Sequence, residues 1–169
     1  MNQHLDRLNF LAPMLYAPAL RFIQLAQGKG ITLTVVFTWR SVQEQSLIYQ
    51  KGRTFDRAQG IWTVSNAAQV VTNAKPGVSA HNVVTRDGKP AAMALDVMPM
   101  KDGQIDWVTG FAFWQPLYAL AWKCGLDPLG DQQGAFLAGD WGHLEEPCWR
   151  YKLDALQYVQ PTTDLSVGV

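Results

Sequence analysis

Two histidines and two aspartates, spread widely over a chain that has only three histidines, place the strongest constraint on the fold. They lie in three short segments: SAH at 79–81, ALD at 94–96 and DWGH at 140–143. Neutral imidazole and carboxylate are ligands that Zn²⁺ prefers, and a catalytic zinc site keeps three protein ligands and one open position. We therefore predict that His81, Asp96 and His143 bind Zn²⁺, which requires the fold to bring three distant segments together.

Further polar residues near these segments suit hydrolytic chemistry. Zinc lowers the pKa of a bound water to about 7, and a carboxylate beside that water can take its proton. Asp140 is our candidate for this general base, with Glu145 as the second choice. Arg40 follows a predicted strand, and a cation there could bind a substrate carboxylate or an oxyanion. Structural roles stay open, because Asp140 could form a cap or salt bridge and Arg40 a surface ion pair.

Length and composition indicate one globular domain over residues 1–169. Hydrophobic residues make up 48% of the chain, charged residues 17%, and the formal net charge is zero. The absence of a basic excess argues against nucleic-acid binding, and no apolar run approaches the roughly 20 residues that span a bilayer. The first residues lack the pattern of a signal peptide. We expect a monomer that is made in the cytoplasm and does not insert into a membrane.

The two cysteines, Cys124 and Cys148, cannot form a disulfide framework. The sequence does not say whether they pair with each other. We expect buried free thiols, and a structural zinc site built on cysteine is the minor alternative.

Local patterns predict a mixture of helices and strands. Apolar periodicity indicates a helix over 8–27, which Pro13 and Pro18 could divide in two. The β-branched run 31–38 indicates a strand, and Ser41 with a glutamate three residues later indicates a capped helix through residue 50.

The remaining segments complete the predicted α+β domain. Residues 113–123 read as a buried helix, and glycine-rich residues 126–139 as a loop over the site. Residues 53–78 carry no predicted element except a short helix at 66–70.

The segment between the first two proposed ligands contains Asp87-Gly88, a strong signal for a two-residue type I′ hairpin turn. If Arg86 pairs with Lys89, His81 falls opposite Ala94. Asp96 then points to the same face as His81, as a diagonal neighbour within reach of one metal ion.

Several ordered motifs resemble the zinc D-Ala-D-Ala peptidase family (M15), which includes the L-alanyl-D-glutamate endopeptidases of bacteriophages. The three ligand segments carry the metal signature of that family, and segments 38–41, 44–45, 49–54 and 71–79 are similar to its phage endopeptidase branch. The resemblance runs from about residue 30 to residue 145. One departure is that His81 and Asp96 are fifteen positions apart, further than is usual in the family.

The resemblance implies a small antiparallel sheet flanked by helices, with Zn²⁺ in a groove. It implies His81, Asp96 and His143 as ligands and Asp140 as general base. It also implies that Arg40 binds substrate or steadies the tetrahedral intermediate. We further expect two residues at the substrate: Ser79, as an orienting group rather than a nucleophile, and Trp141, between two proposed site residues.

Taken with the resemblance, these features predict a zinc metallopeptidase that hydrolyses the peptidoglycan stem peptide at the L-Ala–D-Glu bond. The expected role is that of a phage or prophage endolysin, acting in the periplasm on the cell wall after release by a holin-type partner. One alternative is a D-Ala-D-Ala carboxypeptidase. Two others stay open: a non-catalytic cell-wall-binding or phage structural domain, and an amidase acting on a soluble peptide.

Overall fold

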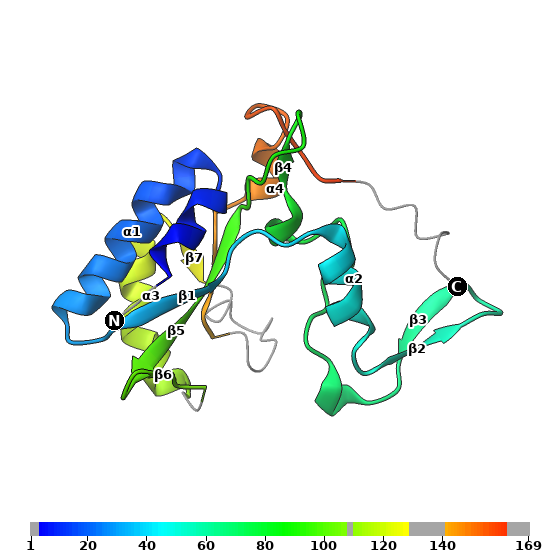
Figure 1. Cartoon of the computed structure of the whole chain (residues 1–169), viewed down its shortest axis with the longest axis horizontal. Helices are drawn as coiled ribbons and strands as arrows, with labels where there is room; N and C mark the ends of the chain where they lie inside the picture. The colour runs from blue at the N-terminus through cyan, green and yellow to red at the C-terminus, as the bar shows by residue number, and fades with distance from the viewer. Residues whose placement is uncertain (1–3, 108–109, 129–140, 162–169) are drawn as a thin grey trace.

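The centre of the molecule is an antiparallel sheet, seen here in a computed structural model that describes residues 4–107, 110–128 and 141–161. Its strands run in the order β1 (Leu33–Phe37), β5 (Ala94–Lys101), β8 (His143–Glu145) and β7 (Asp127–Pro128). The short β6 (Gln104–Ile105) pairs with the far end of β5. Helices flank this sheet (Figure 1), which confirms the α+β class predicted from the sequence.

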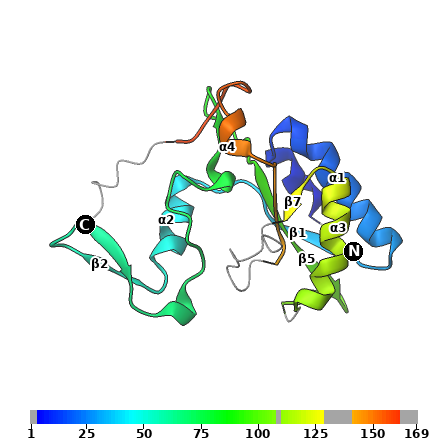
Figure 2. The ribbon, with the colours of Figure 1, turned by 180° about the vertical axis from the view of Figure 1, so that it is seen from behind.

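Two helices, α1 (Pro13–Gly28) and α3 (Phe111–Lys123), pack beside the sheet and enclose the main core. The view from behind shows both helices next to the strands (Figure 2). Fully buried side chains fill the space between helices and strands: Leu15, Phe22, Leu33, Leu95, Trp114, Leu117 and Leu144. Alternate residues of each strand face this core, so the intervening residues are presented on the opposite face of the sheet.

The N-terminal helical pattern divides at Pro13 rather than at Pro18. A 3-10 helix, η1 (Leu5–Phe10), precedes α1, and Pro13 stands at the start of α1. Proline suits the first position of a helix because its missing N–H would have no partner there. Pro18 lies inside α1 without ending it.

A second region, which we call the arm, projects from the sheet (Figure 1). It contains α2 (Val42–Gln50), the hairpin β2 (Arg53–Asp56) and β3 (Ile61–Val64), and η2 (Ala67–Gln69). The predicted capping box is present, since the Ser41 hydroxyl accepts from the Glu44 N–H and the Glu44 carboxylate accepts from the Ser41 N–H. The short helix expected at 66–70 is confirmed as η2, but the sequence analysis missed the β2–β3 hairpin.

The turn after the first proposed ligand differs from the type I′ hairpin predicted for Asp87-Gly88. The Thr85 N–H donates to the Lys89 carbonyl, so the loop holds three residues, and only Gly88 has a positive φ. Thr85 shapes this loop, because its hydroxyl donates to the Asp87 carboxylate and accepts from the Lys89 N–H. The predicted pairing of residue 81 with residue 94 is not formed: residue 81 lies in a 3-10 turn, and the Met93 N–H donates to the Ala80 carbonyl, a shift of two positions from the predicted register.

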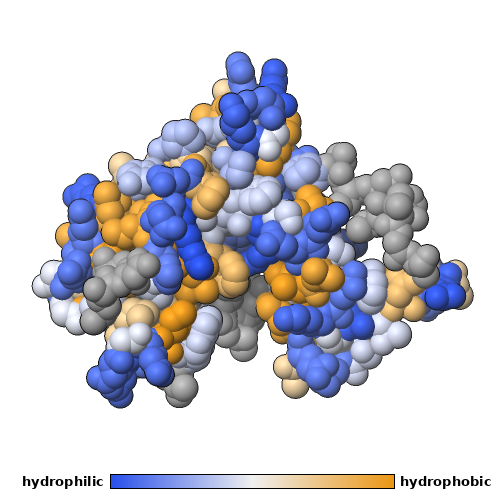
Figure 3. All heavy atoms as spheres, in the orientation of Figure 1, coloured by the Kyte–Doolittle hydropathy of each residue, from blue (hydrophilic) through white to orange (hydrophobic). Residues whose placement is uncertain are grey.

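The segment around this turn pairs with the C-terminal part of the chain. β4 (Val84–Thr85) pairs with β9 (Tyr158–Val159), and α4 (Trp149–Lys152) lies nearby at the top of Figure 1. Hydrophilic residues cover this end of the molecule in Figure 3. Both cysteines are free thiols, with Cys124 buried and Cys148 exposed. Among the described residues, no helix has the length and apolarity needed to cross a membrane.

Candidate metal centre

The open face of the central sheet carries two of the three predicted ligands in direct register. Asp96 of β5 pairs with His143 of β8, and the next pair, Leu95 with Leu144, points into the core. Glu145 lies two residues beyond His143 and therefore on the same face as the ligands. The alternation of the strands thus separates a polar metal face from an apolar core face.

An irregularity in β1 brings two consecutive apolar side chains to the edge of this face. The register with β5 shifts between Val35 and Phe37, and the consecutive residues Val36 and Phe37 both line the cavity described below. A β-bulge has this effect because its extra residue bends the strand and re-aims a side chain. Arg7 of η1 holds the bulge, since its guanidinium donates to the carbonyls of Val35 and Val36.

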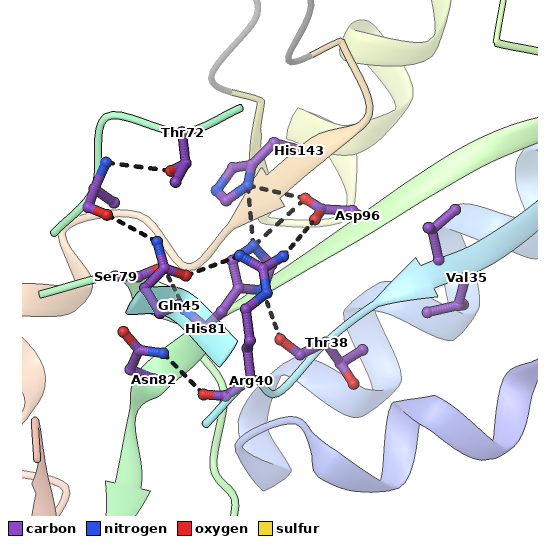
Figure 4. Close-up of polar contacts among 12 residues, drawn as sticks. Val35, Thr38, Arg40, Gln45, Thr72, Ser79, His81, Asn82, Asp96 and His143 are labelled. Carbon is purple, nitrogen blue, oxygen red and sulfur yellow. Dashed lines mark hydrogen bonds and ion pairs between the residues drawn. The ribbon is translucent and has the colours of Figure 1, made fainter. Parts of the chain in front are cut away.

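The third ligand comes from a 3-10 turn, η3 (Ala80–Asn82), rather than from a strand. His81 Nε2 lies 3.3 Å from His143 Nδ1 and 3.4 Å from Asp96 Oδ1, and the last two atoms are 3.0 Å apart. Tetrahedral zinc with ligand distances near 2.0–2.1 Å separates neighbouring ligand atoms by about 3.3 Å. The three donors, shown converging in Figure 4, therefore fit one Zn²⁺ with little adjustment.

Hydrogen bonds aim both imidazoles at the metal position. His81 Nδ1 lies 2.5 Å from the Thr38 carbonyl, so Nδ1 carries the proton and Nε2 is left as the ligand atom. His143 is turned the other way, with Nδ1 at the metal position and Nε2 3.3 Å from Glu145 Oε2. Carbonyl or carboxylate partners of this kind set the tautomer and orientation of metal-ligating histidines.

Asp96 is held in the charged state that a metal ligand requires. Its side chain is only 21% exposed, and burial by itself would raise its pKa. Electrostatic interactions and hydrogen bonds with His81 and His143 outweigh burial and hold the pKa of Asp96 well below its usual range.

Arg40 lies at the edge of this centre and is positioned by polar neighbours. Its Nη1 donates to Gln45 Oε1 over 2.8 Å, and Nη2 is 3.7 Å from Asp96 Oδ2. Gln45 is fully buried and in turn donates to the Ala74 carbonyl. Asn82, also fully buried, donates to the Arg40 carbonyl (Figure 4).

The sequence analysis assigned no role to Gln45 or Asn82. Their positions in the sequence could have indicated a role. Gln45 lies one helical turn before Tyr49 on the buried face of α2, and Asn82 follows His81 directly. Buried amides are costly unless they are hydrogen-bonded, so an amide on a buried face indicates a structural partner.

A cavity of about 300 Å³ opens over the metal centre. One wall includes Asp96, His143 and Glu145 of the sheet together with His81 of η3. The opposite wall comes from α2 and residues 71–74. The lining residues are Val36, Phe37, Arg40, Ile48, Val71, Thr72, Ala74, Ser79, Ala80, His81, Asp96, Met98, Trp107, Gly142, His143, Glu145 and Arg150. The metal position is therefore accessible from a space large enough for part of a peptide.

The other predicted site residues have different outcomes. Ser79 lines the cavity, and its hydroxyl accepts from the His81 N–H, which fits the expected orienting role. Trp141 is not brought to the cavity: its ring packs 6.1 Å from that of Phe111, and its carbonyl accepts from Tyr118. Asp140 lies outside the described residues, so its role as general base remains a prediction.

Gly142 allows β8 to approach β5 closely enough for the ligands to meet. Its carbonyl accepts from the Val97 N–H, and a Cβ at this position would lie 1.9 Å from the Val97 carbonyl oxygen. No side chain fits at that distance, so the residue before His143 must be glycine for this register to form.

Two histidines and one aspartate, convergent on a position that fits tetrahedral zinc and faces a cavity, define a mononuclear zinc-hydrolase type of site. Residues 9–111 match the model of the VanY family, described as D-alanyl-D-alanine carboxypeptidase. The chain belongs to this family of zinc peptidases, and the metallopeptidase class predicted from the sequence is confirmed. No curated protein sequence matches the chain.

Solved structures share the fold. The vancomycin-resistance D,D-pentapeptidase VanY from a VanB-type cassette, solved with Zn(II), has a TM-score of 0.53 at 17% identity, covering 86% of this chain and 78% of that one. The Serratia marcescens L-Ala D-Glu endopeptidase ChiX has a TM-score of 0.50 at 17% identity, with coverages of 86% and 87%. The LD-carboxypeptidase LdcB reaches 0.53 at 21% identity, with coverages of 86% and 70%. These likenesses confirm the predicted fold.

Proposed function

We propose that this chain is a peptidoglycan hydrolase that cleaves the stem peptide at the L-Ala–D-Glu bond, in the role of a phage or prophage endolysin. The observation that carries the proposal is the convergence of His81, Asp96 and His143 on a cavity that also contains Arg40. The site of action would be the cell wall, reached with the help of a holin-type partner, and the enzyme would act as a monomer.

The chemistry of the substrate explains why a cation beside the metal is useful. In the stem peptide D-glutamate continues the chain through its side-chain carboxyl, so its α-carboxylate is free next to the L-Ala–D-Glu bond. Arg40 carries a planar guanidinium that suits a carboxylate, and Gln45 holds it beside Asp96. A bound stem peptide would therefore be oriented by Arg40 with its scissile carbonyl at the metal position.

Different residues of the chain would have different roles in hydrolysis. His81, Asp96 and His143 would hold Zn²⁺, which would polarise the scissile carbonyl and make water a stronger nucleophile near neutral pH. Thr38 and Glu145 keep the two imidazoles oriented. Asp140 is proposed to take the proton of the attacking water and to pass it to the leaving amine, which then departs as a free D-glutamate amine.

A D-Ala-D-Ala carboxypeptidase is the second candidate, and the description of the family supports it. A C-terminal D-alanine also carries a free carboxylate next to its scissile bond, so Arg40 would serve either substrate. The two activities are distinguished by their products rather than by this part of the site.

The test is lysis of outer-membrane-stripped Gram-negative cells by zinc-loaded protein, with and without a chelator, followed by mass analysis of the fragments. Chelator-sensitive loss of turbidity with a new D-glutamate amine supports the proposal, and release of free D-alanine supports the carboxypeptidase. The Asp140→Ala variant should keep zinc and lose about 10²–10⁴-fold in turnover. Full activity of that variant would remove Asp140 from the mechanism, and no lysis by protein with stoichiometric zinc would contradict the endopeptidase.

A further inference from the structure

A second arginine lines the cavity besides Arg40. Arg150 belongs to the short helix α4, and its side chain forms part of the cavity wall. Figures 1 and 2 both show α4 beside β4, in a different part of the chain from the Arg40 segment. The cavity lining therefore includes two arginines that come from separate segments of the chain.

Arg150 is positioned without being neutralised. Its guanidinium lies over the indole of Trp149, 4.4 Å from the ring centre, and Nη2 donates to the Val78 carbonyl over 3.5 Å. Trp149 is buried, which gives the guanidinium a firm support. Within the described ranges, no carboxylate forms an ion pair with Arg150, whereas Lys152 of the same helix is paired with Glu146.

The two arginines have different surroundings. Arg40 already contacts Asp96 and Gln45 at the metal centre, while Arg150 contacts the Trp149 indole and the Val78 carbonyl. An exposed guanidinium with open donors at a cavity wall suits an anionic group of the bound molecule, because a planar fork matches a carboxylate. One substrate with two carboxylates could therefore engage both arginines.

We propose that Arg150 binds a second carboxylate of the stem peptide, the side-chain carboxylate of a diamino dicarboxylic residue (diaminopimelate) at its third position. This inference rests on the proposed function. The third residue neighbours D-glutamate and also neighbours the D-Ala-D-Ala end, so its carboxylate is close to the scissile residues for either bond. A stem peptide with lysine at that position offers no such group, and Arg150 thereby selects between the two peptidoglycan chemistries.

The experiment uses two pentapeptides, L-Ala-γ-D-Glu-X-D-Ala-D-Ala, in which X is diaminopimelate or its side-chain amide. Zinc-loaded wild type, Arg150→Met and the control Arg86→Met are compared in turnover and, by calorimetry, in binding. Arg86 is exposed in the turn after β4 and is not among the cavity-lining residues, so it controls for the loss of one positive charge.

For the wild type we expect a KM about tenfold lower for the free carboxylate than for the amide, as for one charge-assisted hydrogen bond. Arg150→Met should abolish that preference with kcat within about twofold, and Arg86→Met should keep it. An equal effect of Arg150→Met on both peptides, or none, overturns the proposal. If the wild type cleaves neither peptide, the proposed function fails. The calorimetric binding preference then tests the role of Arg150, and equal binding of both peptides by the wild type overturns that role.

Discussion

The central sheet and the β2–β3 hairpin are both antiparallel, yet they differ in the support they receive from the rest of the fold. β5 and β8 contribute Leu95, Val97 and Leu144 to the core, each fully buried. No residue of β2 or β3 is buried, although Phe55 and Trp62 pack across the hairpin with ring centres 5.3 Å apart. Two of the three proposed metal ligands, Asp96 and His143, therefore lie on the unit whose geometry the core enforces.

The cavity lies between the sheet and α2 with the segment 71–74, not against the β2–β3 hairpin itself. Val36 and Met98 line it from the sheet, and Ile48 and Val71 line it from the arm side. Metal binding needs donor positions accurate to a fraction of an ångström, which a packed sheet supplies. A wall from a less buried region can change with little effect on the metal centre, because fewer core contacts depend on it.

The largest expected effect is the loss of a proposed metal ligand. His81→Ala or His143→Ala should abolish stoichiometric zinc binding. Turnover should fall at least as much as when a general base is removed, about 10²–10⁴-fold. Metal analysis and hydrolysis assays measure the two effects. The control is His4→Ala, which changes the remaining histidine of the chain. Full zinc content in either ligand variant would show that the metal binds elsewhere.

Two side-chain truncations, one in the sheet and one in the hairpin, test whether the core stabilises the sheet more than the hairpin. Leu144→Ala should lower the free energy of unfolding by about 2–5 kcal/mol, because it leaves a cavity in the packed core under β8. Val64→Ala, on the exposed hairpin, should change it by less than about 0.5 kcal/mol. Denaturant titration measures both. Equal losses would mean that the arm is as tightly packed as the sheet.

The carboxylate behind His143 should affect zinc affinity more than stability. Glu145→Ala removes the acceptor of the Nε2 proton and should weaken zinc binding by about 10–100-fold. Glu145→Gln keeps an acceptor oxygen and should lose less. Competition with a chromophoric chelator measures the dissociation constants. If both variants bind zinc as the wild type does, Glu145 does not orient His143.

A further prediction concerns the approach of β8 to β5. Gly142→Ala places a Cβ against the Val97 carbonyl, so β8 has to shift, and the change should cost about 3 kcal/mol or more, a fall of roughly 10 °C in Tm. Gly28→Ala is the matched control, because a Cβ there meets no atom within 4 Å. Thermal unfolding of both variants measures the difference. A Gly142 variant as stable as the control would show that β8 can shift without loss.

Much of the metal centre could be predicted because its chemistry is carried by residue identity. Few side chains bind zinc, and a chain with three histidines leaves few combinations for a three-ligand site. The Ser41–Glu44 capping box was equally accessible, since both hydrogen bonds form within four consecutive residues. The register of the turn at Thr85–Lys89 was not, because side-chain hydrogen bonds of Thr85 compete with the turn type that Asp87-Gly88 favours.

Residues whose roles depend on partners far away in the chain could not be identified from the sequence. Arg7 holds the β1 bulge from a helix about thirty positions away, and Gln45 links Arg40 to the Ala74 carbonyl. Trp141 was predicted at the substrate from its position between two site residues. The structure instead packs its ring against Phe111, because neighbours in sequence need not share a face.

The sequence by itself predicted the zinc cofactor, the family of zinc peptidases and the α+β class, and it proposed the three residues that converge in the structure. Donor chemistry and ordered motifs are properties of residue type and spacing, and both can be read without coordinates. Only the tertiary structure decided that Asp96 pairs with His143 across β5 and β8, that Thr38 and Glu145 orient the imidazoles, and that Arg150 shares the cavity with Arg40. These are contacts between segments far apart in the chain, and they exist only once the core has packed.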